Sequence, residues 1–129
     1  ILCYHLPQQS PLSIMNIQII KQKISNAALA TIAKQQFGDF VKAVVDVELS
    51  IMAIGGELHA DEEAVLLEQG SRQQDLWGIN LYPDMPAEEW IEFDAMINVR
   101  PSQGNRSRNV ESPDMRKNIR AVVQTLVSG

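Results

Sequence analysis

The chain has 129 residues, of which 45% are hydrophobic and 21% are charged. Such a chain is long enough and apolar enough to form a globular core. It holds no run of about 18 apolar residues, which excludes a membrane-spanning helix of the usual kind. The net charge of −5 argues against a protein that coats nucleic acid, because such proteins present a basic surface. One cysteine excludes an intramolecular disulfide and a cysteine metal cage, and it fits a cytoplasmic location.

The charge is unevenly distributed along the chain. Residues 1–99 hold five Lys or Arg and fourteen Asp or Glu, a net charge of −9, whereas residues 100–129 hold six and two, a net charge of +4. The sequence therefore predicts a local basic patch on an otherwise acidic protein.

Residues 1–14 contain two prolines, no helical periodicity and no basic segment of the kind that begins a signal peptide. Met15 leads directly into an apolar stretch, residues 17–20, which predicts the first strand. We expect residues 1–14 to be an extension outside the fold, and residues 15–129 to form a single domain.

A helix and a hairpin are predicted next. Ser25 is a typical N-cap, the apolar residues after it have helical spacing, and Gly38 is a typical stop. Residues 41–47 are rich in β-branched residues, and apolar residues occupy the alternate positions 41, 43, 45 and 47, which predicts a half-buried strand. Residues 51–54 are expected to pair back with it.

Residues 57–67 fit two structures. In a helix, Asp61 would be the N-cap and Gly70 would end the helix. In a strand, alternate residues share one face, and their carboxylate and imidazole groups would suit a divalent metal such as Mn²⁺, Mg²⁺ or Zn²⁺. The candidate metal ligands are Glu57, His59, Asp61 and Glu63.

A second hairpin and a final helix complete the pattern. Residues 77–82 and 90–99 alternate as strands do, and Pro101 would end the second strand. Ser112 is then a typical N-cap with Pro113 in the first helical position. The apolar stripe expected on that helix is Met115, Ile119, Val122, Val123 and Leu126.

The predicted order is β-α-β-β-(short α or β)-β-β-α. It indicates an α+β domain with a mainly antiparallel sheet and two longer helices packed on one face.

The polar loop between the last strand and the last helix is the leading candidate for a binding site. Its arginines can bind phosphate or carboxylate through two hydrogen bonds, and its glycine can adopt a positive φ. The loop leads to a helix N-terminus, which also favours anions. Alternatively, the arginines pair with the acidic part of the chain and the loop is structural. The candidate ligand-binding residues are Asn98, Arg100, Gly104, Asn105, Arg106, Ser107 and Arg108.

A third candidate is the polar face of the second hairpin. Paired carboxylates there could perform acid–base chemistry if burial separates their pKa values, although such a face often simply contacts water. The residues concerned are Asn80, Glu92, Asp94, Asn98 and Arg100.

Four segments resemble, in order, a family of small uncharacterised bacterial proteins, many cyanobacterial, classified as a domain of unknown function. The segments are GGELHADEE at 55–63, LLEQGS at 66–71, LWGIN at 76–80 and INVRPSQGNRS at 97–107. The resemblance covers about residues 15–127 and implies no activity, cofactor or site residue.

Three functions follow as hypotheses. The first is a small cytoplasmic binding or regulatory module for an anionic ligand, namely a nucleotide, a nucleic-acid phosphate or a carboxylate. The second is a metal-dependent hydrolase that uses His59 and Asp61 with Glu57 or Glu63. The third is a structural or partner-binding protein without a small-molecule site, for which a sheet edge would allow a homodimer. Convergence of His59 and the arginine loop in one cleft would favour a ligand site or an enzyme.

Overall fold

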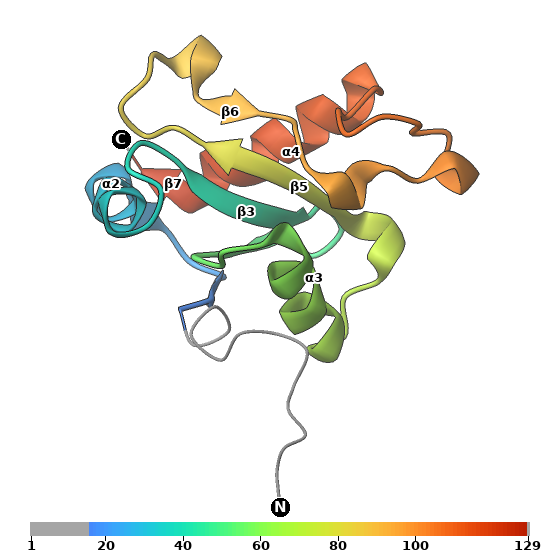
Figure 1. Ribbon diagram of the computed structural model, residues 1–129, viewed down its shortest axis with the longest axis horizontal. Coiled ribbons are helices and arrows are strands. Elements are labelled where there is room, and N and C mark those ends of the chain that lie inside the picture. Colours follow the sequence, from blue (N-terminus) through green and yellow to red (C-terminus); the bar gives the residue numbers. More distant parts are fainter. Residues whose placement is uncertain (1–15, 129) are drawn as a thin grey trace, which may run out of the picture.

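The computed structural model describes residues 16–128, so the extension predicted over residues 1–14 lies outside the described residues. Five antiparallel strands form the central sheet, in the order β1-β4-β3-β5-β6 (Figure 1). The strands are β1 (Gln18–Ile20), β3 (Val41–Asp46), β4 (Ile51–Ile54), β5 (Leu76–Leu81) and β6 (Ile91–Glu92). A short parallel ladder joins β2 (Ile24–Ser25) to β7 (Val127–Ser128). The predicted α+β class is confirmed.

Helices cover both faces of the sheet. The helices α2 (Asn26–Gln35) and α4 (Pro113–Leu126) contribute to the main hydrophobic core on one face, as predicted for the two longer helices. The helix α3 (His59–Glu68) lies on the opposite face from α4 (Figure 1). Its Leu66 packs there in a second core with Val44, Ala53 and Leu76. Of the two structures considered for residues 57–67, the helix is therefore the one that forms.

Local capping signals predicted two of the helices correctly. Ser25 Oγ accepts a hydrogen bond from the Ala28 N–H at 3.0 Å, and Ser112 Oγ accepts one from the Met115 N–H at 3.1 Å. Each bond satisfies an N–H group that has no partner within the helix. The predicted stripe on α4 is also confirmed, since its members are buried or pack against the main core.

The prediction of a half-buried strand over residues 41–47 is wrong about burial. The strand β3 forms, but both of its faces are covered, because α3 packs where solvent was expected. Val44, on that second face, is fully buried.

The predicted cap of α3 is also wrong, whereas its predicted end is confirmed. The helix begins at His59, its N-cap is Leu58, and Asp61 lies buried within the first turn. At the other end Gly70 has a φ of +104°. The Gly70 and Ser71 N–H groups close the helix on the carbonyls of the last turn, at 3.1 Å each.

The strand predicted over residues 90–99 is mostly absent. Within this segment only the two residues of β6 pair with β5, in the register Asn80↔Glu92 and Leu81↔Ile91. The chain then leaves the sheet and forms short 3₁₀ turns. The 3₁₀ segments of the described chain are Gln73–Asp75, Ala87–Glu89, Met96–Asn98 and Pro101–Gln103.

A side chain replaces the missing strand. Asn98 Oδ1 accepts a hydrogen bond from the Gly78 N–H at 2.8 Å, and Asn98 Nδ2 donates one to the Gly78 carbonyl at 2.9 Å. Asn98 is fully buried, so its carboxamide pairs with the edge of β5 as a strand peptide would. The apolar alternation that predicted a strand has another origin. Phe93 enters the main core and Ile97 packs against the second one.

Replacing Asn98 by alanine should therefore destabilise the fold. Asn98→Ala leaves the buried Gly78 N–H and carbonyl without partners, and we expect a loss of about 2–4 kcal/mol in the free energy of unfolding. Asn109→Ala is the matched control, because the Asn109 side chain is exposed and forms no hydrogen bond among the described residues. Urea denaturation of both variants measures the difference. Equal stabilities would contradict the role assigned to Asn98.

Candidate functional site

A pocket of about 400 Å³ opens on the face of the sheet that carries α3. It brings together residues from β3, α3, β5, β6 and the loop before α4. Its polar lining consists of Lys42, His59, Asn80, Glu92, Asp94 and Arg108, and its apolar lining includes Phe40, Leu58, Met96 and Ile97.

The floor of the pocket is set by strand register. Lys42 of β3 lies opposite Asn80 of β5, and Asn80 lies opposite Glu92 of β6. Directly opposed residues of antiparallel strands project on the same side of a sheet. The three residues therefore form a polar row across three strands.

His59 reaches this row because β5 has a glycine beneath it. A Cβ at Gly78 would lie 3.2 Å from His59 Cδ2 and 2.5 Å from the Ala95 Cβ. His59 Nε2 lies 2.8 Å from the carbonyl oxygen of Ile79, which can only accept a hydrogen bond. Nε2 is thus the donor, and in the neutral ring Nδ1 carries the free lone pair.

Burial lowers the pKa of His59 below its ordinary value, and the positive charge of Lys42 lowers it further. Hydrogen bonding to the Ile79 carbonyl and to the Asn80 side chain, and the charge of Asp94, oppose this effect. The net result is a ring that is neutral at pH 7.

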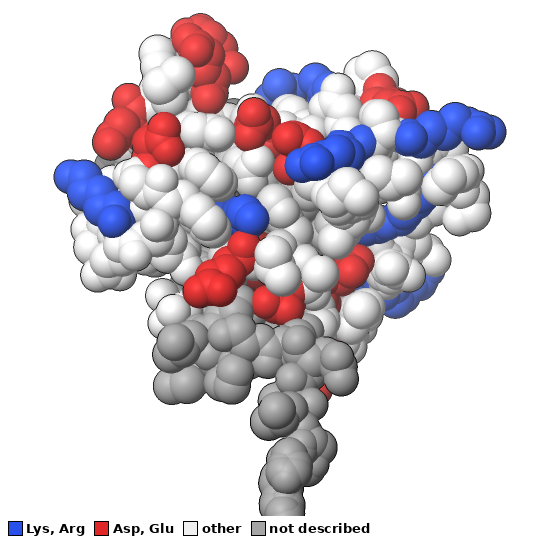
Figure 2. All heavy atoms as spheres, in the orientation of Figure 1, with Lys and Arg blue, Asp and Glu red and all other residues white. Residues whose placement is uncertain are grey.

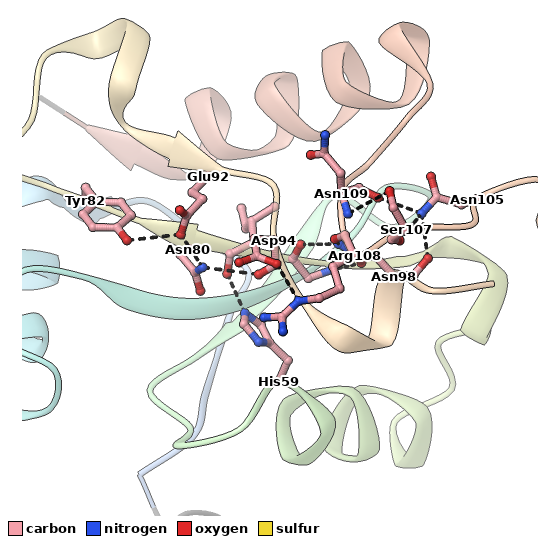
Figure 3. Close-up of polar contacts among 12 residues, drawn as sticks. His59, Asn80, Tyr82, Glu92, Asp94, Asn98, Asn105, Ser107, Arg108 and Asn109 are labelled. Atoms are coloured by element: carbon pink, nitrogen blue, oxygen red, sulfur yellow. Dashed lines mark hydrogen bonds and ion pairs between the residues drawn. The ribbon is translucent and has the colours of Figure 1, made fainter.

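Glu92 is held by two donors (Figure 3). Asn80 Nδ2 donates to Glu92 Oε1 at 2.8 Å, and the Tyr82 hydroxyl donates to the same oxygen at 3.1 Å. Burial, and secondly the hydrogen bond to Glu92, raise the pKa of Tyr82 to about 12, so the hydroxyl remains a donor at neutral pH. Asn80 Oδ1 is buried and accepts no hydrogen bond of normal geometry from the described residues.

Arg108 forms the opposite wall with Asp94. Arg108 Nε lies 2.7 Å from Asp94 Oδ1, and both side chains are about half exposed (Figure 3). The Arg108 carbonyl accepts hydrogen bonds from Asn98 Nδ2 at 3.0 Å and from the Ala95 N–H at 3.1 Å. The backbone is thus fixed, while the terminal guanidinium nitrogens form no hydrogen bond among the described residues.

The structure gives Arg100 a structural environment. Its side chain is 8% exposed and donates to the carbonyls of Ile97 at 3.0 Å, Gln73 at 2.9 Å and Leu76. It also stacks over the Trp77 ring. A ligand cannot reach a guanidinium in this position.

The remaining loop candidates separate into two groups. Asn98 and Asn105 are buried, and Asn105 Nδ2 holds the loop by donating to the carbonyls of Asn98, Ser107 and Asn109. Gly104 has the expected positive φ of +81°. Gly104, Arg106 and Ser107 are exposed and do not line the pocket. Of the predicted loop residues, the pocket contains Arg108.

The candidate metal ligands are not brought together. Glu57 precedes α3, and the other three lie in its first turns with different neighbours. His59 bonds to the Ile79 carbonyl, and Glu63 lies 3.6 Å from Arg100. Asp61 is buried, whereas Glu57 is exposed. Within residues 16–128 no group of three or more His, Cys, Asp or Glu residues could hold a metal ion.

Of the three candidate sites predicted from the sequence, the polar face of the second hairpin contributes the most residues to the lining of the pocket. Asn80, Glu92 and Asp94 line it, although Asn98 and Arg100 turn elsewhere. Lys42 was missed, because a single lysine in a strand pattern carries no functional signal. Its register with Asn80 is the information that would have identified it.

The basic patch expected from the charge asymmetry does not appear on this face. Figure 2 shows acidic and basic side chains interspersed over it. Two arginines of the C-terminal part lie beside carboxylates from the rest of the chain, Arg108 at 2.7 Å from Asp94 and Arg100 at 3.6 Å from Glu63.

A family model described as "Protein of unknown function (DUF5674)" matches residues 18–126. The chain belongs to this family. The match confirms the resemblance to a family of unknown function, and the matched range includes every polar residue of the pocket. No curated protein and no solved structure matches the chain. Among the described residues, no helix has the length and apolar character needed to cross a membrane.

The lowered pKa of His59 predicts a pH dependence of stability. As the pH falls below about 6.5, the unfolded chain takes up a proton before the folded protein does, so the free energy of unfolding decreases. His59→Gln removes this contribution. The stability deficit of the variant should therefore shrink, or reverse, as the pH is lowered from 7.5 to about 5. Denaturant titrations of both proteins across this range measure it, and a pH-independent difference would contradict the assignment.

Proposed function

We propose that the protein binds a small anionic ligand, a carboxylate or a phosphate, in the pocket beside His59. The observation that carries the proposal is the convergence of Lys42 and Arg108 on one pocket with a neutral histidine. These residues are far apart in the sequence, and one of them comes from the arginine loop.

Lys42 and Arg108 each have N–H donors that form no hydrogen bond among the described residues. Lys42 Nζ donates one hydrogen bond, to the Glu57 carbonyl at 2.8 Å, and an ammonium group has three N–H donors. Arg108 uses Nε for Asp94, which leaves the planar edge formed by its terminal nitrogens for a carboxylate or phosphate.

The size of the pocket and the surface around it favour a small molecule. A volume of about 400 Å³ suits a metabolite, because ligand pockets commonly measure roughly 300–1,000 Å³. The interspersed charges on this face (Figure 2) would repel an extended polyanion as often as they attract it. A nucleic acid is thus a poorer match than a free carboxylate or phosphate.

We further propose a bacterial, cytoplasmic setting. This proposal is supported by the single cysteine of the chain and by the resemblance of its sequence segments to bacterial proteins.

Two arginines of the same loop provide a matched test. Titration with succinate and with inorganic phosphate, followed by NMR, should shift the signals of His59 and Asn80. Arg108→Gln should weaken binding at least tenfold, about 1.4 kcal/mol, because a charged hydrogen-bond donor is lost. Arg106→Gln, an exposed change outside the pocket, should leave the affinity unchanged. Equal effects of the two variants, or no binding of either anion, would refute the proposal.

A further inference from the structure

We infer that the ligand of this pocket also carries a protonated amine, so that the pocket recognises a zwitterion of the amino-acid type with an apolar side chain. The inference rests on the proposed function, since it keeps the carboxylate at Lys42 and Arg108 and adds a second group at Asn80 and Glu92.

The charges of the pocket are balanced. Lys42 and Arg108 are opposed by Glu92 and Asp94, while His59 is neutral. A simple anion would gain from the two cations and be repelled by Glu92, which lies in the same polar row as Lys42. A ligand with one negative and one positive group matches both halves of the row.

Two acceptor oxygens of the pocket, on Glu92 and Asn80, can take a further hydrogen bond. Glu92 Oε1 receives hydrogen bonds from both Asn80 and Tyr82, which orients the carboxylate and leaves Oε2 without a hydrogen bond among the described residues. Asn80 Oδ1 is the neighbouring acceptor, on a residue that is only 7% exposed. The contact of the Asn80 side chain with His59 falls short of hydrogen-bond geometry and leaves this oxygen unsatisfied.

Asn80 Oδ1 is a buried acceptor, and buried acceptors usually receive a hydrogen bond. Glu92, whose carboxylate is bonded to the same Asn80 side chain, is exposed and supplies a second acceptor beside it. A carboxylate cannot supply a donor to these oxygens, because at pH 7 it only accepts hydrogen bonds. An ammonium group has three N–H donors and no acceptor, and it also offsets the charge of Glu92.

Exposed apolar side chains at the mouth of the pocket can contact an apolar part of the ligand. Leu58 and Met96 line the pocket and are nevertheless 56% and 65% exposed. Phe40 adds an aromatic surface to the same lining. An aliphatic side chain on the ligand would cover these groups and remove apolar surface from water.

Three ligands that share a 3-methylbutyl chain test the inference on the unmodified protein. They are L-leucine, 4-methylpentanoate, which lacks the amine, and 3-methylbutylamine, which lacks the carboxylate. Leucine should bind at least tenfold more tightly than either analogue in calorimetric titrations at pH 7. Glu92→Gln should weaken the binding of leucine and not that of 4-methylpentanoate. Glu89→Gln, an exposed acidic residue outside the pocket, is the control and should change neither.

The outcomes separate this inference from the proposed function. If 4-methylpentanoate binds as tightly as leucine and Arg108→Gln weakens both, the amine is not recognised and the anion site stands. If 3-methylbutylamine binds as tightly as leucine, the carboxylate is not recognised and both proposals fail. If leucine does not bind, the zwitterion is refuted, and the succinate and phosphate titrations still decide the anion site.

Discussion

The pairing of the Asn98 carboxamide with the Gly78 peptide determines where the sheet ends and where the last loop lies. It satisfies the edge of β5 without a strand, so the chain after Glu92 is free to leave the sheet. The same carboxamide holds the carbonyl of Arg108. One buried side chain thereby ends a sheet and positions the loop that forms a wall of the pocket.

Gly78 has a second role, because its missing side chain makes room for the ring of His59. The helix α3 can then begin directly over the sheet, and its first residue meets the polar row of Lys42, Asn80 and Glu92. The lowered pKa of His59 follows from this placement, since both burial and a nearby lysine act on the ring. The chemistry of the pocket is thus a consequence of how closely helix and sheet approach.

Signals that act within a few residues were predictable from the sequence. The caps at Ser25 and Ser112 and the stripe of α4 depend on neighbours three or four positions away, and all are found as expected. The segment after Glu92 was predicted wrongly, because its period of two arises from contacts with two different cores rather than from a strand. In the arginine loop, too, the sequence predicted the residue types but not the environments of their side chains.

Composition identified the guanidinium groups of that loop, but only the fold determines their environments. Arg100 points inward to backbone carbonyls, whereas Arg108 faces the pocket. The register between the strands likewise determines which residues lie side by side in the polar row. That register cannot be deduced from a single sequence.

The short length of β6 has a consequence for self-association. An unpaired strand edge is a template on which a second chain can add by hydrogen bonding. Here the outer edge of β5 is occupied by two residues of β6 and by a carboxamide, which has no continuing backbone to extend. Another chain could add along β5 only by displacing the buried Asn98. The side chain that helps to shape the pocket thus also closes this stretch of the outer edge of β5 to pairing with another chain.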